Sequence, residues 1–310
     1  MAENSSIRMT ENLIEKTHRQ MVELIDFNKS TEEGPSGINN LDTILRTAVE
    51  ESLQTLRLLT GLEIEQTTRI LEVGAGYGLA SICLSLMGFE VTALEPGGVG
   101  FEDNKKVSQY LISKCGVCIH HIDESAETFD FAKIHKFQLI LSNNVLEHIP
   151  NVDLALDNLA TALSTDGIMV HSCANYAFPF EPHYGIPLIP LAPRLTKLML
   201  PSSIKNDGVW KSLNFITASS VKRNSRKNQL HLYFRRGTMS TSIRRLKIDV
   251  QFASRHPLLA RVVQNSMVYS IAIKLLNLPV SLATPMDFMM CTQTAATSRL
   301  GSSWLNRKYS

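Results

Sequence analysis

Residues 70–78 have the sequence Ile-Leu-Glu-Val-Gly-Ala-Gly-Tyr-Gly, and this stretch decides the fold class. Its first residues belong to an apolar run, Arg69–Val73, that predicts a buried strand, and a helical pattern begins at Leu79. Three glycines stand between them, where the chain must turn sharply and where a ligand can approach the backbone without meeting a Cβ. The N-terminus of the helix offers free N–H groups. The stretch therefore predicts a strand, a ligand-binding turn and a helix.

A regular alternation of expected strands and helices continues from this turn to residue 173. Strands joined by helices imply right-handed crossovers and a parallel sheet, so the expected fold class is α/β. The expected strands are Arg69–Val73, Phe89–Leu94, Val117–Ile122, Phe137–Leu141 and Ile168–Ser172, the last after a turn at Asp166-Gly167. The expected helices are Leu79–Met87, Glu102–Lys114 and one that Asn151 caps.

The chain divides by composition and periodicity into four expected parts. A helical stripe of apolar residues starts at Leu41, after a break at 34–37 that contains Gly and Pro. Segments near 217–227 and 251–277 also predict helices. The expected parts are a helical cap over residues 1–60, the alternating core over 61–173, a Pro-rich insertion or lid over 174–216, and a basic C-terminal part over 217–310 that completes the sheet.

The bulk composition is typical of a globular protein in a reducing compartment. Hydrophobic residues make up 44% of the 310 residues and charged residues 19%. The polar N-terminus lacks the apolar core of a secretory signal, and no run of about 18 apolar residues predicts a membrane span. The five cysteines are an odd number, which favours free thiols. We therefore expect a cytoplasmic protein.

The charges are unevenly distributed along the chain. Residues 1–150 carry 12 Lys and Arg against 22 Asp and Glu, whereas residues 151–310 carry 19 against 7. One interpretation is that the basic half meets an anionic partner. The other is that the two halves attract each other within the fold.

The spacing of the glycines distinguishes between two classes of ligand. A dinucleotide site has the pattern G-x-G-x-x-G, whereas Gly74, Gly76 and Gly78 follow G-x-G-x-G. Glu72 stands just before them, where its charge would repel a pyrophosphate and attract an ammonium group. Glu95 ends the second expected strand, at the place where an acid accepts hydrogen bonds from ribose hydroxyls. These features favour S-adenosylmethionine (SAM) over NAD, and an NAD-dependent oxidoreductase is the alternative.

Residues 69–173 resemble the class I SAM-dependent methyltransferases that act on small molecules. Three segments carry the resemblance, ILEVGAGYG, TALEP and FQLILSNNVLEHIPN. It implies a Rossmann-like, doubly wound and mostly parallel seven-stranded sheet, whose final antiparallel pair would be Leu230–Phe234 and Met286–Cys291. It also implies that the cofactor is SAM. The cofactor-binding residues that the glycine spacing and the resemblance together indicate are Glu72, Gly74, Ala75, Gly76, Gly78, Glu95, Ser125, Ala126 and Asn143.

Several features bear on what accepts the methyl group. The turn after the fourth strand lacks the Asn/Asp-Pro-Pro-aromatic sequence of adenine amino-methyltransferases, and the chain has no Pro-Cys nucleophile of cytosine enzymes. A small-molecule acceptor is therefore expected, and no nucleic acid. Some relatives bind a metal ion through a Glu-x-x-Glu-His pattern, but Asn144 stands in place of the first Glu. Only Glu147 and His148 remain, so no metal site is expected.

Three side chains are candidates for acid–base catalysis. His148 ends the Leu-Glu-His sequence after the fourth strand, and the alternative is that it packs at the start of the next helix. Glu181 and His183 follow the fifth strand, in a stretch similar to one in related bacterial enzymes, and are expected to form an acid–base pair. The alternative for this pair is a structural loop.

The basic tract Lys222–Lys227 and the apolar insert before it bear on the kind of acceptor and surface that the protein meets. Together they favour an anionic acceptor, linked to a lipid or glycan, and contact with a membrane surface. A solvated basic face is the alternative. A third interpretation of the whole chain is a non-catalytic scaffold that keeps the fold.

Overall fold

A computed structural model of the chain describes residues 6–25, 41–97, 104–255, 257–275, 279, 282–298 and 304. The predicted break at 34–37 and the predicted start of a helix at Glu102 lie outside these residues.

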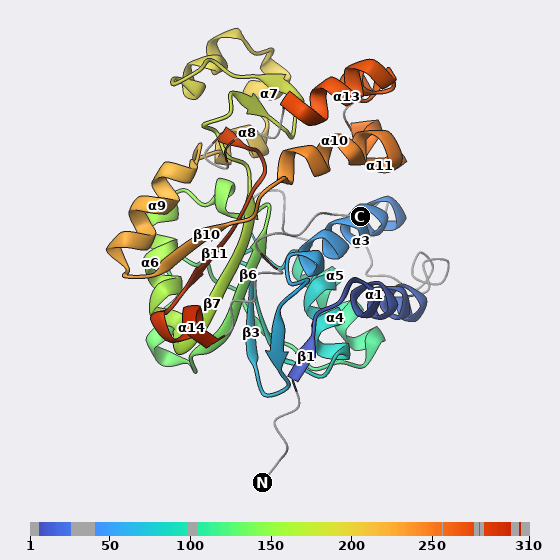
Figure 1. Cartoon of the computed structure of the whole chain (residues 1–310). Coiled ribbons are helices and arrows are strands. Elements are labelled where there is room, and N and C mark those ends of the chain that lie inside the picture. The colour runs from blue at the N-terminus through green and yellow to red at the C-terminus, as the bar shows by residue number, and fades with distance from the viewer. Residues whose placement is uncertain are drawn as a thin grey trace.

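A twisted seven-stranded sheet forms the centre of the molecule (Figure 1). Its strand order is β10-β11-β7-β6-β3-β4-β5. β11 pairs antiparallel with both β10 and β7, and the other neighbouring strands of this sheet pair in parallel. The predicted α/β class and mostly parallel sheet are confirmed, including the final antiparallel pair. The strands are β3 (Arg69–Val73), β4 (Glu90–Leu94), β5 (His120–Ile122), β6 (Phe137–Asn143), β7 (Leu163–Cys173), β10 (His231–Phe234) and β11 (Met286–Cys291).

Helices cover both faces of the sheet (Figure 1). Side chains alternate along each strand, so Leu139 and Leu141 of β6 join one core while Ile140 between them joins the other. The second core also contains residues of α6 (Val152–Ala162) and α9 (Ala218–Lys227). The first core receives α1 (Glu11–Ile25), α3 (Leu41–Arg57), α4 (Leu79–Leu86) and α5 (Asn104–Cys115).

Two strands begin several residues away from their predicted starts. The turn expected at Asp166-Gly167 is wrong, because β7 already begins at Leu163. The extra residues are absorbed by a register shift against β6, between Phe137 and Leu139. Apolar periodicity alone does not reveal such a bulge, because it depends on the neighbouring strand. The strand predicted at 117–122 is shorter, since β5 begins at His120.

The segment after β7 carries short elements rather than a long helix. Near Glu181 the chain forms a small two-stranded sheet, and short helices follow it. These elements are β8 (Phe180–Glu181), β9 (Ile186–Pro187), η3 (Pro193–Met199), α7 (Ser202–Lys205) and α8 (Gly208–Ser212). The other short elements are the pair β1 (Ser6–Arg8) and β2 (Glu63–Glu65), and the turns η1 (Phe131–Lys133) and η2 (Leu146–His148).

A group of C-terminal helices has its own small core, formed by Ile243, Leu246, Ala260 and Val263. The sequence predicted helix over 251–277 but missed α10. Within the described residues, no helix is both long and apolar enough to cross a membrane. The helices are α10 (Thr238–Ile248), α11 (Val250–Arg255), α12 (Pro257–Val263), α13 (Ser266–Leu275) and, after β11, α14 (Gln293–Ser298).

One backbone carbonyl connects distant parts of the chain. The oxygen of Leu58, just after α3, accepts hydrogen bonds from Nη2 of Arg235 and from the indole Nε1 of Trp304, both at 2.9 Å. The Arg235 guanidinium also stacks 4.4 Å from the Trp304 ring centre and pairs with Asp287. Because these side chains are buried, their polar groups need these partners.

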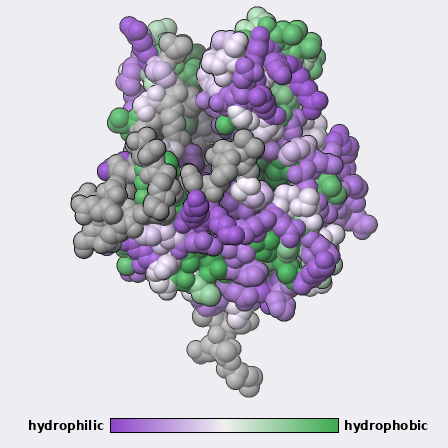
Figure 2. Space-filling view, turned by 180° about the vertical axis from the view of Figure 1, so that it is seen from behind, coloured by the Kyte–Doolittle hydropathy of each residue, from purple (hydrophilic) through white to green (hydrophobic). Residues whose placement is uncertain are grey.

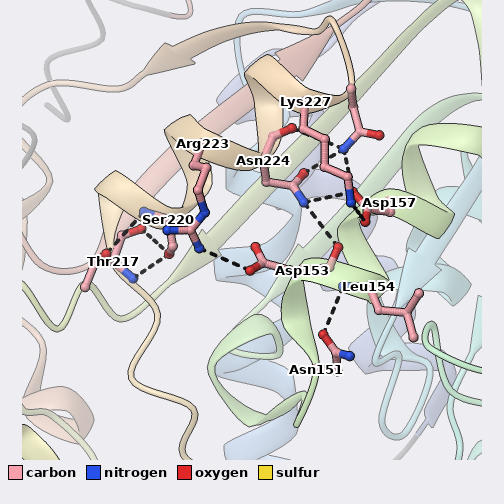
Figure 3. A network of polar contacts seen from close by, with 10 residues as sticks. Asn151, Asp153, Leu154, Asp157, Thr217, Ser220, Arg223, Asn224 and Lys227 are labelled. Atoms are coloured by element: carbon pink, nitrogen blue, oxygen red, sulfur yellow. Dashed lines mark hydrogen bonds and ion pairs between the residues drawn. The ribbon is translucent and has the colours of Figure 1, made fainter.

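The basic helix α9 packs against α6 through a network of polar contacts (Figure 3). Asp157 of α6 accepts hydrogen bonds from Asn224, Asn228 and Lys227. Asp153 pairs with Arg223 at 3.1 Å. Both helices belong to the basic second half, so these ion pairs neutralise part of the basic tract locally and leave both interpretations of the charge distribution open.

Asp157→Ala is expected to lower the free energy of unfolding by about 2 kcal/mol, because it removes a charged acceptor from three donors. Asp153→Ala is the matched control. Its ion pair is exposed, so we expect a loss of at most about 0.5 kcal/mol. Urea denaturation of both variants measures the difference, and equal losses would contradict this account of the contact between α6 and α9.

Candidate functional site

The loop between β3 and α4 is built from glycines in the left-handed conformation. Gly74, Gly76 and Gly78 have φ angles of 68°, 54° and 76°, which residues with a side chain rarely adopt. A Cβ on Gly74 would lie 2.4 Å from Cγ2 of Val145, and one on Gly78 would lie 2.7 Å from Oγ of Ser108. Glycine is therefore needed at position 74 for conformation and for packing against the loop that follows β6.

The carboxylate of Glu95 braces this loop from the end of β4. Its Oε2 accepts a hydrogen bond from the backbone N–H of Gly76 at 2.8 Å, and its Oε1 accepts one from Asn104 at 3.3 Å. The N–H groups of Gly74 and Ala75 are directed to the carbonyl of Leu94, at 2.8 and 3.3 Å. The acid and the glycine loop predicted to bind the cofactor are thus in direct contact.

Glu72 lies deeper than its expected role at the ligand suggests. Its side chain is buried and accepts a hydrogen bond from the Ser81 hydroxyl of α4 at 2.5 Å. Burial raises its pKa to about 7, although the hydrogen bond from Ser81 acts in the opposite direction. Glu72, at the end region of β3, is thus tied by this hydrogen bond to α4, the helix that follows the glycine loop.

The remaining predicted cofactor residues lie in the loops after β5 and β6. Ser125 forms a turn in which its hydroxyl lies 3.1 Å from that of Thr128. Ala126 is buried, and its carbonyl accepts a hydrogen bond from Asn158 of α6. Asn143 ends β6 and donates to the Thr55 hydroxyl of α3 at 3.2 Å, so the N-terminal helix α3 reaches the carboxyl end of the sheet.

The turn η2, which carries Glu147 and His148, lies next to the glycine loop. It begins directly after Val145, the residue that contacts Gly74. Asn214, at the end of the insertion, holds the turn through three hydrogen bonds, from its side chain to the carbonyls of Leu146 and Ile149 and from its backbone to that of Glu147. Sequence reasoning missed Asn214, because nothing in its local pattern indicates contact with residues nearly 70 positions earlier.

A chain of polar side chains runs from the insertion to η2. Oε1 of the buried Glu181 lies 2.5 Å from Nδ1 of His183, and Nε2 of His183 lies 3.4 Å from Nε2 of His148. Nδ1 of His148 lies 2.8 Å from the Ser212 hydroxyl. The structure thus brings the three predicted catalytic residues together, and it adds Ser212, which the sequence did not indicate.

The surroundings of these side chains shift the pKa values of both histidines and of the neighbouring Glu147. Burial, and then the charge of His183, lower the pKa of His148 to about 4. Burial alone would lower the pKa of His183, but the hydrogen bond and charge of Glu181 outweigh it and raise the pKa. Burial raises the pKa of Glu147 to about 7, and the N–H of Ala174 donates to its Oε1 at 3.2 Å.

Gly74→Ala is expected to cost several kcal/mol of stability, about 1 kcal/mol from the left-handed backbone and 1–3 kcal/mol from overlap with Val145. Gly76→Ala is the control, because its φ is also positive but nothing lies within 4 Å of the added Cβ. We expect this control to lose only about 1 kcal/mol. Urea denaturation distinguishes the two, and equal losses would show that Val145 does not constrain the loop.

Glu72 is expected to make stability fall as the pH rises. A carboxyl whose pKa is about 7 when folded, but 4.5 in its ordinary state, keeps its proton longer in the folded protein. Stability is therefore lost between pH 4.5 and 7, by an amount on the order of 3 kcal/mol. Glu72→Gln is expected to remove this part of the pH dependence. Chemical denaturation at pH 5 and pH 8 measures it, and an unchanged difference between the two pH values would contradict the assignment.

Comparisons with known proteins identify the family of the chain. A family model described as a methyltransferase domain matches residues 45–232, more than half of the chain. An uncharacterized protein of Mycobacterium tuberculosis is 34% identical over 194 residues, which cover 60% of this chain and 65% of that protein. The ubiquinone biosynthesis O-methyltransferase of Rickettsia prowazekii is 28% identical over 107 residues, 34% of this chain and 40% of that protein. The chain thus spans less than two thirds of the length of both relatives.

Among solved structures, phosphoethanolamine N-methyltransferase 2 of Haemonchus contortus, in complex with S-adenosyl-L-methionine, has a TM-score of 0.46 and 12% identity. The match covers 73% of this chain and 48% of that one. The family match and the strand order agree with the resemblance carried by the glycine loop. The chain belongs to the methyltransferase-domain family and has the class I fold of SAM-dependent methyltransferases.

Proposed function

We propose that the protein transfers the methyl group of SAM to an anionic small molecule that is presented on a lipid surface. The observation that carries the proposal is the contact between Gly74 and Val145. It places the loop expected to hold SAM directly beside the turn that carries His148. Cofactor and acceptor would therefore meet at the carboxyl ends of β3 and β6, where ligands of open α/β sheets bind.

Methyl transfer to an acceptor requires positioning, exclusion of water and, for a hydroxyl acceptor, removal of a proton. In our proposal Nε2 of His183 receives that proton. The Glu181 carboxylate, bound to Nδ1 of the same ring, orients the imidazole and stabilises the positive charge that forms. Tyr176 donates a hydrogen bond to Glu181 at 3.3 Å and so helps to hold the carboxylate in place.

The surface of the insertion supports a lipid-presented acceptor. Leu198 and Met199 are each 77% exposed, and Leu191 is fully exposed. Figure 2 shows hydrophobic residues gathered at the end of the molecule that the insertion forms. Arg194 and Lys197 of η3 stand between Leu191 and Leu198 in the sequence. Exposed apolar groups next to cations are typical of surfaces that dock on anionic membranes.

The cofactor assignment is tested by isothermal titration of the full chain with S-adenosylhomocysteine and with NAD. We expect S-adenosylhomocysteine to bind and NAD not to bind. Glu95→Ala should weaken binding about tenfold or more, because a charge-assisted hydrogen bond is lost. Glu90→Ala, at the opposite end of β4, is the control and should bind like the wild type. Binding of NAD alone would favour an oxidoreductase, and binding of neither ligand would favour a scaffold.

The lipid surface is tested by sedimentation with vesicles of phosphatidylglycerol and of phosphatidylcholine. We expect binding to the anionic vesicles only, and at least a tenfold loss for Leu198→Ser combined with Met199→Ser. Leu154→Ser, at an exposed apolar residue of α6, is the control. Equal binding by the wild type and the double variant, or methylation of uncharged soluble metabolites only, would contradict the proposal. Methylation of a soluble glycan-linked anion would place the acceptor on a glycan instead.

A further inference from the structure

The side chains of Glu147, His148 and His183 form a cluster that the proposed reaction does not fully explain. One ligand atom from each, a carboxylate oxygen and two ring nitrogens, lie within 4.8 Å of one another. We propose that this cluster binds a divalent transition-metal ion of the zinc type. The inference rests on the proposed function and changes one step of it, because with an ion bound Nε2 of His183 would be a ligand and could not receive the proton of the acceptor.

The hydrogen bonds of the two histidines determine which ring atoms are free. The Ser212 hydroxyl donates to the carbonyl of Val209 at 2.8 Å, so its oxygen is left to accept the proton on Nδ1 of His148. Nδ1 of His183 donates to the Glu181 carboxylate. Both Nε2 atoms then present lone pairs to each other at 3.4 Å. Because lone pairs repel, a positive centre is required between them, either a proton or a metal ion.

The distance between the two nitrogens fits a tetrahedral metal site. Zinc binds histidine nitrogen at about 2.0–2.1 Å with tetrahedral angles, which places two such nitrogens roughly 3.3–3.4 Å apart. The observed separation of the Nε2 atoms of His148 and His183 is 3.4 Å. The two Nε2 atoms are therefore already as far apart as two ligand atoms of a tetrahedral zinc site.

The buried carboxyl of Glu147 favours a metal ion over a shared proton. The residue is 1% exposed, and among the described residues none donates a hydrogen bond to its Oε2. Leaving such an atom without a partner is costly. A proton between the histidines would not satisfy it, whereas a cation bound by all three side chains would.

The groups behind the ligands are those expected of a metal site. A ring nitrogen opposite the metal usually donates to a carboxylate or another oxygen, which fixes the tautomer of the histidine. Glu181 does this for His183, and Ser212 does it for His148. The His183 side chain is 29% exposed, which gives an ion a route from solvent. Two nitrogens and one oxygen favour zinc or a similar ion over magnesium or calcium.

The sequence indicated no metal site because it offered only two neighbouring ligands. The third, His183, is 35 residues beyond His148 and comes from the insertion. The insertion is held on η2 by the hydrogen bonds of Asn214. The ligand set is thus completed by tertiary structure and not by a local motif.

The test uses the full chain, treated with a chelator and dialysed, then titrated with Zn²⁺ by calorimetry and with Co²⁺ by visible absorption. We expect one equivalent to bind, with the intense visible bands of tetrahedral Co²⁺. His183→Ala should weaken binding about 100-fold. Glu181→Gln should weaken it about tenfold, as the loss of a residue that hydrogen-bonds a metal-binding side chain typically does. His135→Ala, at an exposed histidine elsewhere, is the control. Circular dichroism checks that each variant folds.

Two results would overturn the proposal, namely no Zn²⁺ binding by the folded wild type, or equal binding by His183→Ala and His135→Ala. Titration of the same samples with S-adenosylhomocysteine keeps this test separate from that of the proposed function. If that ligand binds and Zn²⁺ does not, only the metal site is wrong. If Zn²⁺ binds and that ligand does not, the metal site stands and the proposed function fails.

Discussion

The close approach of Gly74 to Val145 is the constraint on which the rest of the site depends. The two residues follow neighbouring central strands, β3 and β6, and no side chain fits between the loops that they begin. The glycine loop and the turn η2 are therefore fixed relative to each other by backbone packing. Glu95 on one side and Asn214 on the other then need only hold each loop in place. Rigid placement of this kind is what transfer between two bound molecules requires.

Much of this arrangement could be predicted from local sequence. The glycine spacing, the acid at position 95 and the alternation of strands and helices depend on residues near each other in the chain, where periodicity and turn chemistry act directly. The Asn151 cap of α6 is confirmed for the same reason, since its side chain accepts a hydrogen bond from Leu154 only three residues away. The early start of β7 could not be predicted, because it depends on pairing with β6.

The site on the acceptor side was only partly predictable, for a related reason. His148, Glu181 and His183 were identified by their residue types, but their contact depends on how the segment after β7 folds onto the turn η2. The partners Ser212 and Asn214 were missed, since a serine or asparagine in a polar loop has no distinguishing pattern. Contacts across long stretches of chain are set by tertiary packing, which a single sequence does not display.

The carbonyl of Leu58 has a consequence for how the protein is made on the ribosome. Its partner Trp304 follows 246 residues later. At a synthesis rate of about 5–20 residues per second, the ribosome needs roughly 12–50 s to deliver that indole. Until then the end of α3, which also supplies Thr55 to Asn143, lacks one of its anchors. The end of α3 is therefore fully anchored only once Trp304 has been made, long after the parallel strands β3 to β7 have left the ribosome.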